Sequence, residues 1–314
     1  MFRGAGLGSA GEGWHRSGWP YVMQALQPWF AEDAPVLLDD YVERTFLLKP
    51  HRNKGLVHRS PWIGVFHHPL KDPFGQGTGQ KALRNSPAWQ ESLPQLKLAV
   101  VLAEHLAPGM GKLWGVPCLV LRHPTEVPAL RWSPEAFQRN PSKKLVQIGA
   151  YLRNTHAIFQ AGAPPWLEKV RLSQGAAWVQ QLHAHCRGLF PGRRDVGAVT
   201  EMTRLPPDAY DRLLAENLVF LELLDVVANN TIVECIARDT PIVVNRLPGT
   251  EFYLGRDYPL FYQDIGEVEA LLTPERILEA HHYLTQLPKD WLNGETFARA
   301  LVEGCLQTVP ELWS

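Results

Sequence analysis

The feature that most constrains the fold is a regular alternation of strand-like and helix-like segments in the second half of the chain. Short runs rich in Val, Ile and Leu are each followed by one segment with helical spacing of its apolar residues. Parallel strands need a crossover long enough for a helix, and this alternation is its usual form. We therefore predict a parallel, doubly wound α/β sheet. The strand-like runs span 168–173, 195–202, 217–225 and 240–247, and the helical segments span 176–190, 206–217 and 229–239.

The first half also contains apolar runs that end in polar or proline-containing turns, which is typical of buried parallel strands. These runs span 34–42, 62–69, 93–108 and 116–126. Residues 70–92 are rich in Gly, Pro and polar side chains, and they predict a long loop. Residues 131–144 have few apolar positions and two prolines, which indicates a linker. We expect one domain over 1–140, a second over 143–285, and C-terminal helices over 286–314 that cross back to the first.

The composition argues against several kinds of partner. The formal net charge of the 314 residues is −1, which gives nucleic acid or an anionic membrane little electrostatic attraction. The four cysteines are scattered without a CxxC pair, as expected for reduced thiols in a reducing compartment. No apolar run reaches the roughly 18 residues of a membrane span, and the N-terminus lacks a signal-peptide core. We predict a cytoplasmic protein without a transmembrane segment.

A candidate phosphate site follows the strand at 217–225. A helix is expected to begin at Asn229 or Asn230, because Asn is among the best N-cap residues. The free amide groups of Asn230 and Thr231, together with the helix dipole, would bind a phosphate. Glu234 lies one turn further along, where its carboxylate can accept both hydroxyl hydrogens of a ribose diol. The two asparagines also suit a simple helix cap without a ligand.

Residues 228–255, ANNTIVECIARDTPIVVNRLPGTEFYLG, resemble the donor-binding half of glycosyltransferases with the GT-B fold, especially the retaining, family 1-like ones. Glu234 occupies the position of the helix Glu that in that family contacts the nucleotide ribose. Gly249 and Glu251 match a Gly-containing turn and its downstream Glu. The sequence departs from the pattern at Val226, which stands where the family has the first Glu of a pair.

The resemblance extends to other parts of the chain and implies further site residues. Residues 145–159 are similar to the strand and turn that open the family's C-terminal domain, which makes Arg153 a candidate for contacting the donor diphosphate. Lys169 on the next strand is a further candidate. Gly8 lies in a glycine-rich segment similar to the family's first loop, although only three residues precede that segment's first glycine. The resemblance implies two Rossmann-like domains that face each other across a cleft.

The catalytic candidates that follow from the resemblance are His67, His15 and Glu251. His67 or His15 would meet the sugar or the acceptor, and Glu251 would orient the transferred sugar or a neighbouring loop. The resemblance implies transfer of a hexosyl or related group from a nucleotide sugar to a sugar, glycan or small molecule, with retention and without a metal or cofactor. The residues His183 to Cys186 do not suggest a metal site, because helix positions two apart point to different faces.

Two other functions remain open from the sequence. One is a sugar-nucleotide epimerase on the same scaffold, which would need further acidic and basic residues near the ligand. The other is a binding or regulatory protein that keeps the fold without transfer, and the Val at position 226 favours it.

Overall fold

The computed structural model describes residues 1–4, 19–48, 56–74, 79–173, 175 and 177–313. These residues form two compact units. Unit 1 comprises the described residues up to Glu126 together with those from Asp290 onward, and unit 2 comprises Val127–Lys289. Each unit is built around a parallel sheet, with five strands in unit 1 and six in unit 2 among the described residues. The predicted α/β class with two parallel-sheet units is confirmed.

The sheet of unit 1 has the order β1-β2-β3-β4-β5. Its strands are β1 (Phe2–Gly4), β2 (Val36–Asp39), β3 (Trp62–Phe66), β4 (Leu96–Val101) and β5 (Cys118–Val120). Phe2 pairs with Val36 on one side of β1 and forms a parallel bridge to Phe30 on the other. After β1 the chain therefore runs first to Phe30 on one side of this strand and then to β2 on its other side, so the winding reverses between β1 and β2. Ligands of doubly wound sheets bind at such reversals.

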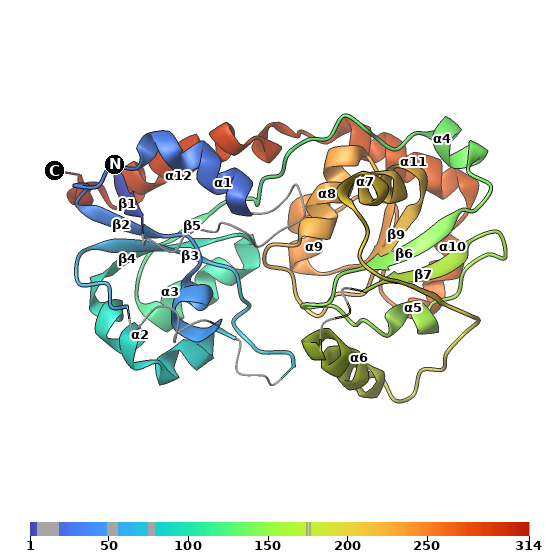
Figure 1. The fold of residues 1–314 in the computed structure, drawn as a ribbon, viewed down its shortest axis with the longest axis horizontal. Coiled ribbons are helices and arrows are strands. Elements are labelled where there is room, and N and C mark those ends of the chain that lie inside the picture. Colours follow the sequence, from blue (N-terminus) through green and yellow to red (C-terminus); the bar gives the residue numbers. More distant parts are fainter. Residues whose placement is uncertain (5–18, 49–55, 75–78, 174, 176, 314) are drawn as a thin grey trace. The chain divides into compact units, whose positions relative to one another are not determined.

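Helices cover both faces of the sheet in unit 1 (Figure 1). The helices of this unit are α1 (Trp19–Leu26), α2 (Pro87–Ser92), α3 (Ala107–Trp114) and α12 (Gly294–Thr308), with short 3₁₀ or π turns at Gln27–Trp29, Arg44–Leu48, Gln80–Asn85, Leu93–Gln95, Glu104–Leu106, Asp290–Leu292 and Pro310–Leu312. Helix α12 packs against α1 on one face, and α2 and α3 lie on the other. The C-terminal segment that begins at Asp290 is therefore part of unit 1.

The prediction of one long loop over 70–92 is wrong for its second half, which contains the turn Gln80–Asn85 and helix α2. The side chain of Ser86 caps α2 by accepting a hydrogen bond from the amide of Trp89, and Pro87 occupies the first helical position. The indole of Trp89 then packs edge-to-face on those of Trp62 and Trp114, with ring centroids 5.8 and 4.6 Å away. Buried tryptophan thus stabilises a segment whose polar composition suggests a loop.

The sheet of unit 2 has the order β11-β10-β9-β6-β7-β8, all parallel. Its strands are β6 (Lys144–Ile148), β7 (Glu168–Leu172), β8 (Thr200–Met202), β9 (Leu218–Leu221), β10 (Ile242–Asn245) and β11 (Phe261–Tyr262). The chain winds outward from β6 to β8, and then from β9 to β11 in the other direction. The reversal lies between β6 and β9, which are neighbours in the sheet.

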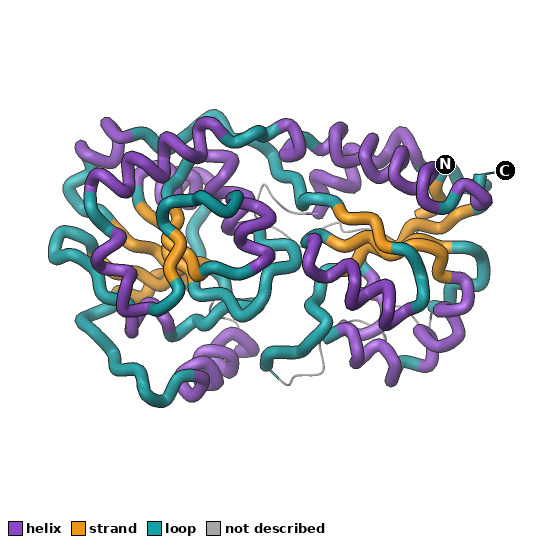
Figure 2. Tube along the Cα trace, turned by 180° about the vertical axis from the view of Figure 1, so that it is seen from behind, coloured by secondary structure: helices purple, strands orange, loops and turns teal. Residues whose placement is uncertain are grey.

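The helices of unit 2 are α4 (Pro134–Arg139), α5 (Ala157–Gln160), α6 (Ala177–Leu189), α7 (Pro207–Glu216), α8 (Asn230–Arg238), α9 (Pro248–Leu254), α10 (Val268–Leu271) and α11 (Pro274–Gln286), with a 3₁₀ turn at Ile265–Glu267. Helices α7 and α9 pack on either side of α8, and α5 lies on the opposite face of the sheet (Figures 1 and 2). Because α8 is covered by its neighbours, residues 231–238 are all buried, polar ones included. No helix among the described residues is long and apolar enough to span a membrane.

Residues 131–144 differ from the expected linker, because they contain helix α4 and the start of β6. The side chain of Ser133 caps α4 by accepting a hydrogen bond from the amide of Ala136 at 3.2 Å. Trp132 is buried, and its amide donates to the backbone oxygen of Arg238 at 2.9 Å. This segment therefore packs within unit 2, and the two units divide between Glu126 and Val127.

Candidate functional site

The loop after β6 brings Arg153 to the point where the winding of unit 2 reverses. Residue 153 forms an antiparallel bridge with Leu223, just beyond the end of β9. The amide of Leu224 donates to the backbone oxygen of Leu152 at 2.9 Å, and the amide of Asn154 donates to that of Glu222 at 2.8 Å. These bonds hold the loop 149–156 across the carboxyl end of β9, at the edge of the sheet where α8 begins.

The guanidinium group of Arg153 lies against the N-terminus of α8. Its Nη2 donates to Asn229 Oδ1 and to Thr231 Oγ1, both at 3.1 Å, and its Nη1 donates to the backbone oxygen of Tyr151 at 2.8 Å. Arg153 is 9% exposed. Burial lowers the pKa of Arg153 to about 10, while nearby Tyr210 and Glu234 act in the opposite direction. Since the N-terminus of a helix is positive, a cation beside it makes the place attractive to an anion.

Backbone geometry in the loop leaves room for Arg153. Gly149 has φ +78°, and a Cβ atom at this position would lie 3.0 Å from the guanidinium carbon of Arg153. Leu152 also has a positive φ of 59°, which is unusual for a residue with a side chain. Two left-handed residues within four positions form the bend that turns Arg153 toward α8. Positive φ is strained for Leu152 but not for glycine, and strained non-glycine positions concentrate at functional sites.

The prediction that an Asn begins the helix is confirmed for Asn229. Its side chain caps α8 by accepting a hydrogen bond from the amide of Ile232 at 3.1 Å. Asn230 is the first residue of the helix, and Thr231 is buried beside Arg153. The structure therefore brings four predicted donor-site residues together, namely Arg153, Asn229, Asn230 and Thr231.

Glu234 lies one turn deeper in α8 and has a partner that the sequence analysis missed. Its side chain is 1% exposed, and its Oε2 accepts a hydrogen bond from the hydroxyl of Tyr210 at 2.6 Å. Tyr210 belongs to α7 and is itself buried. This pair lies close enough to Arg153 to affect its charge electrostatically. No local signal in the sequence links two side chains 24 positions apart on different helices.

Lys169 is not brought to this edge of the sheet. It is the second residue of β7, and its Nζ donates to backbone oxygens of Ala161 at 3.0 Å, of Phe159 at 3.4 Å and of Val196. Burial lowers the pKa of Lys169. Its ammonium group therefore joins two loops of unit 2 rather than pointing toward α8.

Glu251 lies in α9, directly after the carboxyl end of β10. Its Oε1 accepts a hydrogen bond from Arg246 Nη1 at 2.7 Å. Asn245 at the end of β10 binds the backbone of Leu223 twice, with its Oδ1 2.7 Å from the amide nitrogen and its Nδ2 2.9 Å from the carbonyl oxygen. Glu251 is therefore near the same edge of the sheet but is already paired.

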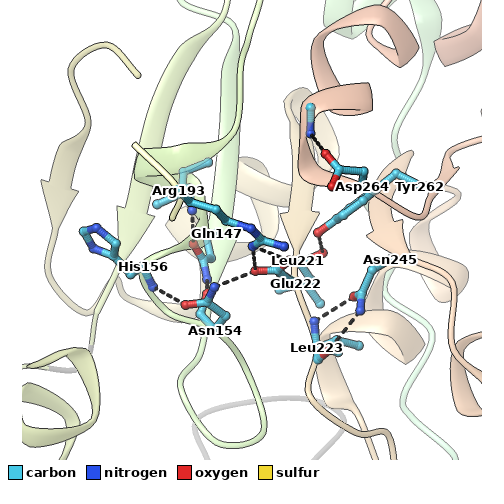
Figure 3. A network of polar contacts seen from close by, with 12 residues as sticks. Gln147, Asn154, His156, Arg193, Leu221, Glu222, Leu223, Asn245, Tyr262 and Asp264 are labelled. Atoms are coloured by element: carbon cyan, nitrogen blue, oxygen red, sulfur yellow. Dashed lines mark hydrogen bonds and ion pairs between the residues drawn. The ribbon is translucent and has the colours of Figure 1, made fainter. Parts of the chain in front are cut away.

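A polar network supports the loop that carries Arg153 (Figure 3). Arg193 Nη1 donates to both carboxylate oxygens of Glu222, at 2.7 and 2.8 Å. Asn154 Nδ2 donates to Glu222 Oε2 at 2.5 Å, and Gln147 Nε2 donates to the backbone oxygen of Asn154 at 2.7 Å. Glu222 is buried at the end of β9. The sequence analysis did not identify this network, whose members come from segments far apart in the chain.

In unit 1, His67 follows β3 and is held by its neighbours. Its ring stacks on Tyr41 with centroids 4.0 Å apart and meets Trp19 edge-on at 4.6 Å. Its Nε2 is 3.0 Å from the backbone oxygen of Asp40. Burial lowers the pKa of His67 well below its usual value, so the ring is neutral at pH 7. Gly8 and His15 lie outside the described residues.

Two acidic residues at the carboxyl end of β2, Asp39 as its last residue and Asp40 directly after it, also escaped the sequence analysis. Asp39 accepts hydrogen bonds from Thr45 Oγ1 at 3.1 Å and lies 2.9 Å from His58 Nε2. Burial raises the pKa of Asp40 to about 6, although Arg44 opposes this with a 2.9 Å ion pair. Among the residues that the structure describes, no group of three His, Cys, Asp or Glu could hold a metal ion.

His123, just after β5, should make unit 1 sensitive to acid. Burial lowers the pKa of His123 from 6.5 to about 4. Because the pKa of His123 is lower in the folded than in the unfolded protein, the free energy of unfolding is unaffected by this group above pH 6.5 and decreases as the pH falls toward 4. This difference in pKa corresponds to a loss of about 3 kcal/mol.

We expect the free-energy difference of unfolding between wild type and His123→Gln to shrink by about 2–3 kcal/mol from pH 7.5 to 4.5. Urea unfolding at both pH values measures this. Comparing variants cancels the opposite contribution of Asp40, whose raised pKa acts in the other direction. The exposed His282→Gln serves as a control with a constant difference. A constant difference for His123→Gln as well would contradict the assignment.

Comparison with solved structures reveals clear relatives in shape. Trehalose-6-phosphate synthase OtsA matches with a TM-score of 0.56 and 11% identity, covering 92% of this chain and 76% of that chain. Anabaena HepE in complex with UDP-glucose matches at 0.54 and 14%, covering 94% and 82%. Sucrose-phosphate synthase from Thermosynechococcus elongatus matches at 0.57 and 12%, covering 89% and 74%.

The chain has the GT-B fold. No protein-family model matches the sequence, and no curated protein gives a significant match. At this level of identity the likeness establishes the fold alone. In this GT-B protein, Arg153 and α8 occupy the reversal of the second parallel sheet, which is the ligand-binding edge of such sheets in general.

Proposed function

We propose that this protein is a glycosyltransferase that binds a nucleotide-sugar donor in unit 2 and transfers the sugar with retention and without a metal ion. The observation that carries the proposal is the position of Arg153 beside the N-terminus of α8 in a GT-B fold. The structural neighbours include a protein in complex with UDP-glucose, which supports a uridine nucleotide as the first donor to test.

The arrangement suits the chemistry of the leaving group. When the bond between sugar and diphosphate breaks, negative charge develops on the phosphate oxygens. Arg153 and the amides of Asn230 and Thr231 would stabilise this charge from fixed positions, which costs no reorganisation during the reaction. Glu234 would lie on the ribose side of the bound phosphate.

The first test is thermal unfolding with UDP, GDP, ADP, TDP and CMP, with and without their sugars. A ligand at 100 times its dissociation constant should stabilise the protein by about 2.7 kcal/mol. We expect one nucleotide to shift the wild type and to leave Arg153→Gln unshifted, with Arg153→Lys between them. The exposed Arg139→Gln in the same unit controls for loss of a positive charge. If no nucleotide shifts the wild type, the proposal is wrong.

Two contacts favour a second candidate, a nucleotide-binding protein that does not transfer sugar. Glu234 is buried and already accepts from Tyr210, and Lys169 donates to backbone carbonyls. The two functions differ in turnover. Release of free nucleotide from the stabilising nucleotide sugar, with or without an added acceptor, supports the transferase, and binding without any release supports the binding protein.

A further inference from the structure

The backbone segment 222–224, directly after β9, determines where Arg153 lies. Residue 153 forms an antiparallel bridge with the buried Leu223, and two backbone hydrogen bonds made by the neighbouring residues flank this bridge. In a bridge of this kind the amide and carbonyl of the central residue point away from the partner strand. Leu223 therefore needs partners on its other side, and a shift of its segment would move the backbone of Arg153 with it.

Asn245, the last residue of β10, supplies both partners (Figure 3). Its Oδ1 accepts a hydrogen bond from the amide of Leu223 at 2.7 Å, and its Nδ2 donates to the carbonyl oxygen of Leu223 at 2.9 Å. The regular pairing of β10 with β9 ends one residue earlier, with Val244 opposite Leu221. Because a carboxamide carries an acceptor and donors, as a peptide group does, the Asn245 side chain extends this pairing beyond the end of β9.

The backbone of Asn245 is itself fixed by its neighbours. Asn245 pairs with Tyr262 in the ladder between β10 and β11, and its carbonyl oxygen accepts a hydrogen bond from Thr250 Oγ1 at 3.1 Å. A single methylene group joins the carboxamide to this backbone, so the strand closely limits where the carboxamide can lie. The contacts therefore run from the sheet through Asn245 and Leu223 to the loop of Arg153 without a long flexible side chain between them.

We propose that Asn245 is a positioning residue for the anion site, and that it sets the direction of the Arg153 guanidinium through Leu223. Without the carboxamide, the amide and carbonyl of Leu223 lose these two bonds, and the segment that aims Arg153 can shift. The planar guanidinium binds a phosphate in a fixed fork geometry, so a change of aim weakens it more than it would a point charge. The inference rests on the proposed function, because it assumes that a phosphate group binds at Arg153 and α8.

A double-mutant cycle measured by calorimetry tests the proposal, with the nucleotide that stabilises the wild type as the probe. Asn245→Ala should raise its dissociation constant at least about tenfold. In the Arg153→Lys background the same substitution should change the dissociation constant by less than about threefold, because the lysine ammonium on its flexible stem does not depend on a fixed direction. A merely structural role would weaken binding by the same factor in both backgrounds.

Asn217→Ala is the matched control, because it removes the same carboxamide from the opposite end of β9. Asn217 Oδ1 accepts from the amide of Lys144 at 2.8 Å, and its Nδ2 donates to the backbone oxygen of Leu213 at 3.0 Å. This control should lower the melting temperature and leave the dissociation constant unchanged. Asn245→Asp is the second variant: it keeps the shape and one acceptor but loses the donor to Leu223, so it should weaken binding as well. It takes the place of Asn245→Ala in the cycle if that variant does not fold.

Three results would overturn the proposal while leaving the proposed function intact. These are wild-type affinity in a folded Asn245 variant, an equal loss of affinity in the wild-type and Arg153→Lys backgrounds, and an equal loss in Asn217→Ala. If no nucleotide binds the wild type, the proposed function itself fails and the inference falls with it. A loss of affinity that is confined to the Asn245 variants and largely absent from the Arg153→Lys background supports both.

Discussion

Replacing Asp211 with alanine is expected to destabilise unit 2 by about 3–5 kcal/mol. Asp211 on α7 pairs with Arg238, the last residue of α8, and Arg238 is 1% exposed. Nη1 of Arg238 also donates to the backbone oxygen of Glu234 at 3.2 Å. Without the carboxylate of Asp211 this ion pair is lost, and it no longer offsets the desolvation of the buried guanidinium.

Hydrogen exchange of the amides in β9 and α8 measures this loss directly, because the two units need not unfold together. Asp211→Asn, which keeps an acceptor oxygen but no charge, should fall between alanine and wild type. The control is Glu168→Ala, which breaks a more exposed ion pair with Lys144 in the same unit and should cost less than about 1 kcal/mol. Equal losses in Asp211→Ala and Glu168→Ala would contradict the role assigned to the buried pair.

The sequence predicted those parts of the site that depend on local chemistry. The N-cap at Asn229 and the helix behind it follow from a single residue type and the helical spacing that comes after it. Arg153 was singled out only through the resemblance of residues 145–159 to the strand and turn that open the C-terminal domain of GT-B glycosyltransferases. The partners of these residues depend on tertiary packing, so the contact of Glu234 with Tyr210 had no signature in the sequence.

Lys169 shows that a correctly predicted strand does not by itself place a side chain at the site. Its strand was predicted correctly as β7, but its position near the beginning of that strand keeps its ammonium group among backbone carbonyls of two loops. A strand assignment alone does not tell which end of the sheet a side chain serves. The carboxyl-end rule applies to residues at the end of a strand or directly after it. Asp39 ends β2 and Glu222 follows β9, and neither was singled out.

The prediction of a linker over 131–144 is wrong, although the sequence contains a signal for the helix that lies there. Ser133 followed by Pro134 is a helix-start signal, with a capping hydroxyl and a proline at the first helical position. Few apolar residues are needed to anchor so short a helix: Trp132 and Phe137 are both buried, with ring centroids 5.3 Å apart. Counting apolar positions underestimates segments that are anchored by large aromatic side chains.

Replacing Glu222 with alanine is expected both to destabilise unit 2 and to weaken nucleotide binding. The carboxylate of Glu222 accepts two hydrogen bonds from Arg193 and one from Asn154, and bonds to charged groups contribute about 1.5–3 kcal/mol each. We expect a loss of at least about 3 kcal/mol. Asn154 is next to Arg153, so releasing its side chain loosens the loop that aims the guanidinium at α8, and we expect the dissociation constant to rise at least tenfold.

The variant Glu222→Gln sharpens the test, because its amide keeps the shape of the side chain but presents only one acceptor oxygen to two donors, Arg193 and Asn154. Its losses should be intermediate. Arg193→Ala removes the donor that binds the same carboxylate, so it should also weaken nucleotide binding. Glu168→Ala should leave nucleotide binding unchanged.

Hydrogen exchange measures the stability of unit 2 and calorimetry measures the affinity for the nucleotide, both on the full chain. If Glu222→Ala lowers stability but binds the nucleotide as tightly as wild type, the network holds the fold without positioning Arg153. A parallel fall in affinity across all three variants would place Glu222 among the residues that prepare the site for its anion.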